Sequence, residues 1–246
     1  AQNFIFASAQ NDIAITANGK YPLKWKNQGK FILDGSDPQN DWQGWIPASQ
    51  NPTVKNPDRG FVSSANQSST DPSYPYYINW EFSPYERGKR INDRLSVMKN
   101  ATADSIINMQ TDSYSIHAQN ILPTILGMID KSKLNATQKE ALRSVTDWNK
   151  FYDAKSIAAS VFDLWTKRLQ FEIWDDEFTV NDIPMRYPSR DRTVQLILHE
   201  QNAKWIDNIH TLIKETLAEL INQSFKFSCD SLEKKYGPIG KSWEWA

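Results

Sequence analysis

The residues best suited to chemistry lie in the segment from Asn56 to Gln67, which reads NPDRGFVSSANQ. Pro57 and Gly60 predict a turn. The following residues, Phe61 to Ser64, predict a strand that ends just before Asn66. An asparagine held rigidly there could donate its amide N–H groups to the oxyanion that forms when a carbonyl is attacked. The residues alone favour the simpler interpretation that Asn66 caps a turn.

An attacking group is harder to find in this sequence. Three serines lie close to the end of that segment, Ser63, Ser64 and Ser68, but no His or Lys accompanies them locally. Cys229 lies on an expected helix with Lys226 one turn before it and no His nearby. Covalent amide hydrolysis requires a nucleophile beside a base. We therefore expect no catalytic nucleophile in this chain.

The sequence also offers no clear metal or cofactor site. His117, His199 and His210 lack a second His or carboxylate at four-residue spacing on the same face, so we expect no metal to bind them. The acidic run Asp175-Asp176-Glu177 predicts a solvated turn rather than a catalytic pair. Cys229 is the sole cysteine, so no intrachain disulfide can form, and no glycine-rich phosphate loop is present.

Composition narrows the class of protein. The 246 residues carry 28 Lys and Arg against 29 Asp and Glu, a balance that argues against a nucleic-acid or anionic-membrane partner. A mean hydropathy of −0.62 and the lack of a long apolar run exclude a membrane-spanning helix. The chain begins at Ala1 without Met and runs at once into strand-like residues. We therefore expect this sequence to be a piece of a longer protein.

The elements that must position Asn66 fall into two parts. Residues 3–7 and 12–16 alternate as a hairpin, and a long Pro- and Gly-punctuated loop follows. From Ser83 the pattern becomes helical, with the expected helices at 83–98, 102–110, 113–131, from 137, and at 154–174, 190–199 and 209–235. Their start signals include capping boxes at Ser83 and Thr137. We predict an α+β fold, with a β and loop segment at 1–82 and a mainly helical segment at 83–246.

Beyond these patterns, the segment from Asn56 to Gln67 resembles the signature that penicillin acylases carry in their large β-subunit. These enzymes are N-terminal-nucleophile hydrolases. Further stretches resemble stretches of the same family and follow one another in the family's order along the chain. They are QNFIFA at 2–7, GKYP at 19–22, DWQGWIP at 41–47, PYER at 84–87, QTD at 110–112, LP at 122–123, DW at 147–148 and WEW at 243–245.

The resemblance implies a fragment of an αββα-type hydrolase that cleaves N-acyl amide bonds, such as β-lactam side chains or acyl-homoserine lactones. Its nucleophile would be the new amino-terminal residue of the β-subunit, usually Ser, exposed by autoproteolysis. Asn66 matches the family's oxyanion-hole Asn, and Arg87 matches an active-site Arg that organises this Asn and the substrate. We expect the two side chains to lie together, because the helix from Ser83 presents Arg87 beside Asn66.

The resemblance also implies partners and a compartment. These are an N-acyl small molecule, the α-subunit and the rest of the β-subunit of the same precursor, and a periplasmic or extracellular location. Ala1 has no nucleophilic atom and residues 1–18 resemble internal strands, so the fragment alone should be inactive. Tyr76 stands where a calcium-ligating Asp would lie, which argues against the calcium that the family often binds.

The oligomeric state and a competing function remain open at this stage. The hairpin would lose its sheet neighbours in a fragment, and its unpaired apolar edge favours a homodimer. A competing function is a non-catalytic module that binds sugar or peptide through aromatic platforms. Its candidate rings are Trp42, Trp45, Tyr74, Tyr76, Tyr77 and Trp80.

Overall fold

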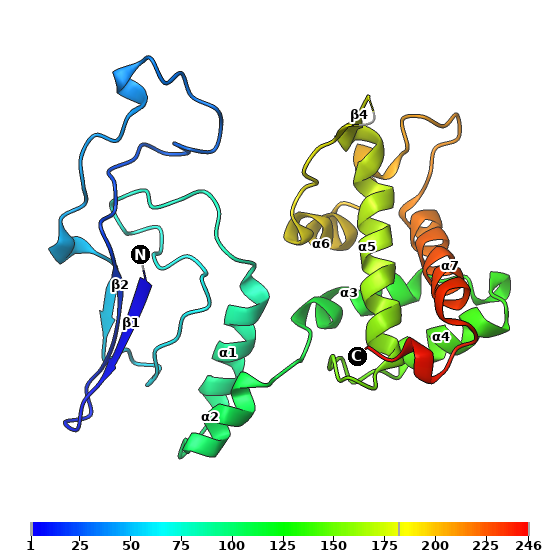
Figure 1. Cartoon of the computed structure of the whole chain (residues 1–246), viewed down its shortest axis with the longest axis horizontal. Helices are drawn as coiled ribbons and strands as arrows, with labels where there is room; N and C mark the ends of the chain where they lie inside the picture. The colour runs from blue at the N-terminus through cyan, green and yellow to red at the C-terminus, as the bar shows by residue number, and fades with distance from the viewer. Residues whose placement is uncertain (1, 182, 246) are drawn as a thin grey trace. The chain divides into compact units, whose positions relative to one another are not determined.

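A computed structural model describes residues 2–181 and 183–245 of the chain (Figure 1). It divides into two compact units, Ala1–Gln110 and Thr111–Ala246, here called the first and the second unit. The first unit holds β1 (Gln2–Ala7), β2 (Ile13–Asn18), β3 (Thr53–Lys55), α1 (Tyr85–Val97), α2 (Ala103–Gln110) and 3-10 turns at Pro38–Asn40 and Ala48–Gln50. Two helices thus belong with the β part.

The predicted hairpin is confirmed. β1 and β2 pair antiparallel with Phe4 opposite Thr16 and Ala7 opposite Ile13. Asn11 takes a left-handed conformation in the connecting turn, with φ 65°, which Asn tolerates better than most residues. β3 adds to the other side of β2. The sequence did not predict β3, because three residues are too few to establish an alternating pattern.

Asn56, the first residue of the Asn56–Gln67 segment, is hydrogen-bonded to this hairpin. Its backbone N–H donates to the Ile13 carbonyl at 2.8 Å, and its Oδ1 accepts from the Ile13 N–H at 2.8 Å. Its Nδ2 donates to Asp12 Oδ1 at 2.7 Å. The residue has φ 45°, again in the region that Asn tolerates. These hydrogen bonds therefore fix the position of the start of the Asn56–Gln67 segment against the hairpin.

The edge strand β1 exposes its apolar side chains. Phe4, Ile5 and Phe6 are each more than half exposed, at 58%, 60% and 57%. This confirms the exposed apolar strand expected from the sequence. Among the described residues β1 pairs with β2 alone. A homodimer through this edge stays a prediction.

Two local expectations for the first unit are wrong. Phe61 to Ser64 form no strand, because a β-favouring composition needs a neighbouring strand to pair with, so Asn66 lies in a loop. The capping box at Ser83 does not form either, because α1 begins at Tyr85 after an extended Pro84 without a side-chain cap. The Ser83 N–H donates instead to the Asn66 carbonyl at 3.0 Å.

The second unit is mainly helical. It contains α3 (Ile116–Gly127), α4 (Ala136–Thr146), α5 (Ile157–Phe178), α6 (Arg190–His199), α7 (Leu217–Tyr236), the short strands β4 (Thr179–Val180) and β5 (Ile183–Pro184), and 3-10 turns at Lys131–Lys133, Lys204–Ile206 and Lys241–Trp243. None of the described helices combines the length and apolarity needed to cross a membrane.

Several helices begin at a different residue from the one predicted. Ser115, not Ser113, caps α3, and the capping box of α4 is Asn135 with Gln138 rather than one starting at Thr137. Asn and Ser are both strong caps, so neighbouring candidates compete. The last helix begins after Thr216, whose side chain forms a capping box with Glu219, eight residues later than the predicted start at Ile209.

The core of the second unit is built around α5, which packs against α4 and α7 (Figure 1). Trp165 of α5 is fully buried and donates its indole N–H to the Ile221 carbonyl of α7 at 3.2 Å. Its ring meets Phe225 edge to face at 4.9 Å. One turn from the end of α5, Trp174 donates to Thr193 Oγ1 of α6 at 2.9 Å. Buried tryptophans with satisfied N–H groups stabilise this unit.

Candidate functional site

The side chains of Asn66 and Arg87 are joined by a short hydrogen bond. Arg87 Nη2 donates to Asn66 Oδ1 at 2.6 Å and to the Ala65 carbonyl at 2.9 Å. The two residues are 21 positions apart in the sequence. Their predicted proximity is therefore confirmed, although Asn66 lies in a loop. Their catalytic roles stay predictions.

This contact orients the Asn66 amide. A guanidinium only donates, so the atom facing Arg87 must be the amide oxygen and not the nitrogen. No hydrogen bond within the described part of the chain uses Asn66 Nδ2, and the residue is exposed. Two N–H donors therefore remain available on a side chain whose other end is held. This is the arrangement that an oxyanion donor requires.

The backbone around Asn66 is held as well. Asn66 has φ 62°, a left-handed conformation, and its carbonyl accepts from the Ser83 N–H, as described above. The Ala65 N–H donates to Gln67 Oε1 at 2.7 Å. Gly88 of α1 is buried against Gln67, where an added Cβ would lie 3.4 Å from Gln67 Oε1. The first turn of α1 thus packs directly on the loop.

Asn92, one turn further along α1, makes a second connection that sequence reasoning missed. Its Oδ1 accepts from Arg59 Nη1 at 2.9 Å and from Ser63 Oγ at 3.4 Å, while its Nδ2 donates to the Gly88 carbonyl at 2.7 Å. The turn that we predicted at Pro57 and Gly60 is confirmed, since the Gly60 N–H donates to the Pro57 carbonyl at 2.8 Å. No local signal pairs residues 33 positions apart.

The nearby serines are not paired with a base. Ser63 Oγ donates to Asn92, Ser64 Oγ accepts from Asn3 Nδ2 at 2.5 Å, and Ser68 Oγ donates to the Thr70 carbonyl at 3.0 Å. These contacts are with amides and backbone, which do not remove a proton from a hydroxyl. That the nucleophile lies outside this chain stays a prediction.

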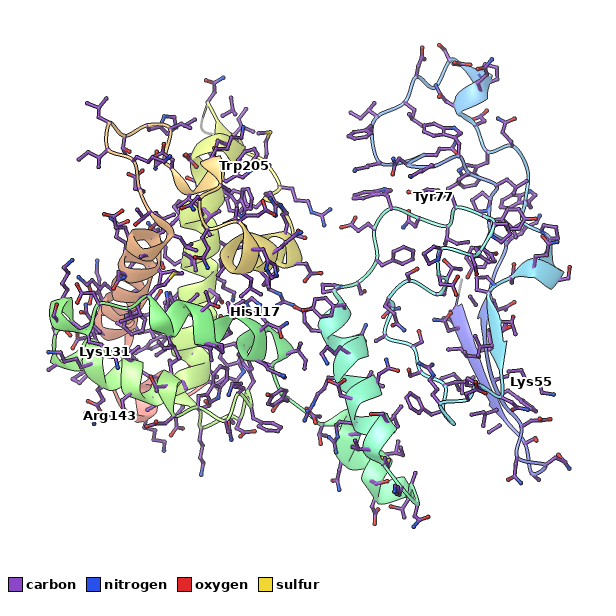
Figure 2. All side chains as sticks on the ribbon, turned by 180° about the vertical axis from the view of Figure 1, so that it is seen from behind. Lys55, Tyr77, His117, Lys131, Arg143 and Trp205 are labelled. Atoms are coloured by element: carbon purple, nitrogen blue, oxygen red, sulfur yellow. The ribbon has the colours of Figure 1, made fainter. Side chains whose placement is uncertain are left out.

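Cys229 and His117 belong to the helical core. Burial raises the pKa of the Cys229 thiol to about 12, so the reactive thiolate is disfavoured. Burial likewise lowers the pKa of His117, which is labelled in Figure 2, to about 3. The centre of its ring lies 5.5 Å from the centre of the Phe162 ring. Among the described residues no group of three or more His, Cys, Asp or Glu side chains is arranged to hold a metal ion. Tyr76, at the expected calcium position, donates its hydroxyl to Gln50 Oε1.

The acidic run at 175–177 is not the solvated turn that we predicted. It lies in the last turn of α5, where Asp176 is buried and its Oδ2 accepts from the Ile209 N–H at 2.8 Å. Asp175 Oδ1 accepts from Thr179 Oγ1 and from the Tyr187 hydroxyl. The run therefore anchors the segments that follow α5, and local sequence could not identify these distant partners.

Glu177 in this run provides a pH test of stability. Burial, followed by the adjacent Asp176 carboxylate, raises its pKa from 4.5 to about 7. Between these values the folded state holds a proton that the unfolded state releases, so the free energy of unfolding should fall as pH rises through this window. Glu177→Gln should reduce that fall. Urea unfolding at about pH 5 and pH 8 measures it, with Glu140→Gln on α4 as control. Parallel pH profiles for wild type and Glu177→Gln would contradict the prediction.

The aromatic residues proposed as a binding platform pack partly on one another. Trp42 and Trp45 meet edge to face at 5.8 Å, and Tyr74 and Tyr76 at 5.7 Å. Lys20 Nζ lies 4.7 Å from the centre of the Trp45 ring. Pairs with this geometry stabilise a fold without any ligand.

A family model for penicillin amidase matches residues 1–246. The chain belongs to the penicillin amidase family. Acyl-homoserine lactone acylase QuiP of Pseudomonas aeruginosa is 22% identical over 266 residues, which cover 99% of this chain and 31% of that protein. Penicillin acylase 2 proenzyme of a Pseudomonas species is 23% identical over 167 residues, covering 68% of this chain and 21% of the proenzyme.

A solved structure supports the same fold. The thermostable penicillin G acylase from Alcaligenes faecalis matches with a TM-score of 0.66 at 14% identity, over 98% of this chain and 48% of that one. The α+β class is therefore confirmed. This member of the penicillin amidase family spans about a third or less of the length of the curated relatives that it matches.

Proposed function

We propose that this chain is part of an amidohydrolase that cleaves N-acyl amide bonds, with Asn66 in the oxyanion hole and Arg87 as its positioning residue. The observation that carries the proposal is the 2.6 Å hydrogen bond from Arg87 Nη2 to Asn66 Oδ1. Membership of the penicillin amidase family supports the reaction class. The competing sugar- or peptide-binding module stays a prediction, because four of its six rings pack in pairs but Trp42, Trp45 and Trp80 remain 58%, 44% and 41% exposed.

In the proposed mechanism another part of the precursor supplies an amino-terminal nucleophile. Its attack on the substrate carbonyl moves negative charge onto the carbonyl oxygen, and Asn66 Nδ2 donates to that oxygen. Arg87 holds the amide in place before the reaction begins, so no reorientation is needed as the charge develops. Its guanidinium also places a positive charge beside the site. The amino group of the nucleophilic residue would take the proton of the attacking hydroxyl and pass it to the amine that leaves when the tetrahedral intermediate collapses, so the acyl group stays on the nucleophile as an ester. Attack by water on this ester would then release the carboxylic acid and restore the hydroxyl.

Partners, substrates and compartment form the rest of the proposal. The remaining α- and β-subunit segments of the precursor would complete the site around Asn66. The substrates would be β-lactam side-chain amides or acyl-homoserine lactones, because the relatives are a penicillin acylase and an acyl-homoserine lactone acylase. We propose a periplasmic or extracellular location.

The test of this function compares two proteins. Full-length, processed protein should hydrolyse phenylacetyl or long-chain acyl amides, whereas residues 1–246 alone should not, because a nucleophile beside a base is required. Release of the free amine measures both. Turnover by residues 1–246 that survives Asn66→Ala would place the catalytic centre elsewhere.

Arg87 is tested in the same full-length protein. Arg87→Ala should lower kcat by about 10- to 100-fold with little change in KM, because the Asn66 amide loses its fixed orientation. Arg87→Lys should restore part of kcat, since an ammonium can still donate to Oδ1. Lys89→Ala is the control on the same helix, where Lys89 makes only an exposed ion pair with Asp93. Equal kcat values for Arg87→Ala and Lys89→Ala would exclude a positioning role.

A further inference from the structure

A cavity of about 410 Å³ lies within the second unit, where the first turns of α5 meet the last turns of α7. The last described residues of the chain, drawn in red in Figure 1, form its third wall. Trp243 anchors this wall, because it is almost fully buried and donates its indole N–H to the Gly237 carbonyl at 2.9 Å. The volume lies within the range of small-molecule sites, roughly 300–1,000 Å³.

Two aromatic rings in the lining of this cavity are partly exposed. Tyr236, at the end of α7, is 45% exposed and Trp245 is 40% exposed. The Trp245 ring is held by Tyr152, whose ring it meets edge to face at 4.7 Å. These rings lie in the second unit and are separate from the aromatic residues at 42–80 considered above. A ligand can therefore stack on a ring whose orientation is set before binding.

The polar groups of the lining are largely unpaired. Ser160 of α5, Ser231 of α7 and Ser242 of the last 3-10 turn each bring a hydroxyl group, and none of the three has a hydrogen-bond partner within the described chain. The same holds there for the Glu244 carboxylate and the Trp245 indole N–H. The lining thus combines groups that donate, accept or do both. An apolar ligand would remove these groups from water without offering partners, which costs free energy.

The charges of the lining disfavour an ionic ligand. Lys235 Nζ lies 4.8 Å from the centre of the Tyr236 ring, so an ammonium group already occupies that ring and repels a second cation. Asp163 and Glu244 on the two other walls carry negative charge and repel an anion. The ligand that fits best is therefore uncharged, with many hydroxyl groups and an apolar C–H face.

We propose that this cavity binds a saccharide, as a second binding activity that does not depend on amide hydrolysis. The C–H face of a sugar ring would stack on Trp245, and its hydroxyl groups, which both donate and accept, would pair with Ser160, Ser231 and Glu244. Each of these protein groups then gains a partner in place of water. The inference goes beyond the proposed function, because every residue that it uses lies in the second unit, whereas Asn66 lies in the first.

The test is binding of four methyl glycosides, those of glucose, galactose, mannose and N-acetylglucosamine, to the full-length protein. Saturation-transfer NMR of each glycoside reports binding without any turnover. We expect at least one of them to bind with a Kd of about 1 mM, the affinity typical of a ligand with about a dozen heavy atoms. Absence of binding by all four at up to about 50 mM would refute the proposal.

Two other probes test the choice of ligand class. Glycerol has hydroxyl groups but no ring to stack, and tetramethylammonium is a cation suited to an aromatic cage. Neither should bind as tightly as the best glycoside. Tighter binding of tetramethylammonium would show a cation site and overturn the proposal.

Variants of the lining identify the groups that bind. Trp245→Ala should weaken binding of the best glycoside about tenfold, because the stacking surface is lost, and Trp245→Phe should restore part of it. Ser160→Ala should weaken binding about threefold. It should not lower thermal stability, because the Ser160 hydroxyl has no partner in the described chain and alanine is a strong helix former.

Phe227→Ala is the matched control for the ring, because it removes a side chain of similar exposure, 44%, from α7 without touching the lining of the cavity. It should leave the affinity for the glycoside unchanged. Equal losses of affinity in Trp245→Ala and Phe227→Ala, or no loss in Trp245→Ala and Ser160→Ala, would refute the site. Amide hydrolysis should be unaffected by Ser160→Ala, so this result and the test of the proposed function can fail separately.

Discussion

Replacing Asn66 by alanine in the full-length, processed protein is expected to lower kcat by about 10²- to 10³-fold, the usual loss when one oxyanion donor is removed. In the proposed mechanism the side-chain amide donates to charge that exists in the transition state and hardly at all in the ground state. KM should therefore change much less than kcat. Steady-state release of the free amine measures both constants.

A second variant separates donation from structure. Asn66→Asp keeps the size of the side chain and an oxygen for Arg87 Nη2, so the loop should stay folded. It removes the N–H donors and places a negative charge where the oxyanion would form. We expect its activity to fall at least as far as that of Asn66→Ala, with unchanged thermal stability. An active Asn66→Asp protein would show that Asn66 merely shapes the loop.

The largest effect on stability is expected at Trp165 of α5. Trp165→Ala should lower the free energy of unfolding of the second unit by about 3–5 kcal/mol, the typical cost of deleting a buried aromatic side chain. The change leaves a cavity beside Phe225 and removes the hydrogen bond to the Ile221 carbonyl. Urea unfolding followed by far-UV circular dichroism measures it.

Two further variants explain that loss. Trp165→Phe separates the ring volume from the hydrogen bond, and Phe227→Ala is a control at a more exposed ring. Trp165→Phe keeps most of the ring volume but not the N–H donor, so it should cost clearly less than alanine. Phe227→Ala on α7 removes a ring that is 44% exposed and stacked on Arg168 at 4.0 Å, and should cost about 1 kcal/mol. If Trp165→Ala were no more harmful than Phe227→Ala, α5 would not be the centre of this core.

Sequence by itself determined those elements whose signals are local. Alternating apolar residues identified the hairpin, and helical periodicity located α6 at its observed bounds. Gly237 follows the helical pattern directly, and it ends α7 with φ 78°, in the left-handed region that favours glycine. The order of family-like segments also identified Asn66 and Arg87 together. The strand, helix and glycine signals each lie within one short stretch of sequence, so distant parts of the chain are not needed to interpret them. The order of the family-like segments, by contrast, extends over most of the chain.

Tertiary structure alone decided how the site is assembled. Before α3 the Ser113 carbonyl accepts from the Tyr152 N–H at 3.1 Å, so this residue is paired with a distant segment and Ser115 caps the helix. The bonds from Arg87 to Asn66 and from Arg59 to Asn92 close loops of 21 and 33 residues through irregular chain. No periodic pattern specifies the path of such a loop, because its course depends on side-chain contacts made only after folding. The family resemblance could place Asn66 beside Arg87, but only the folded chain could show which end of the amide is left free to donate.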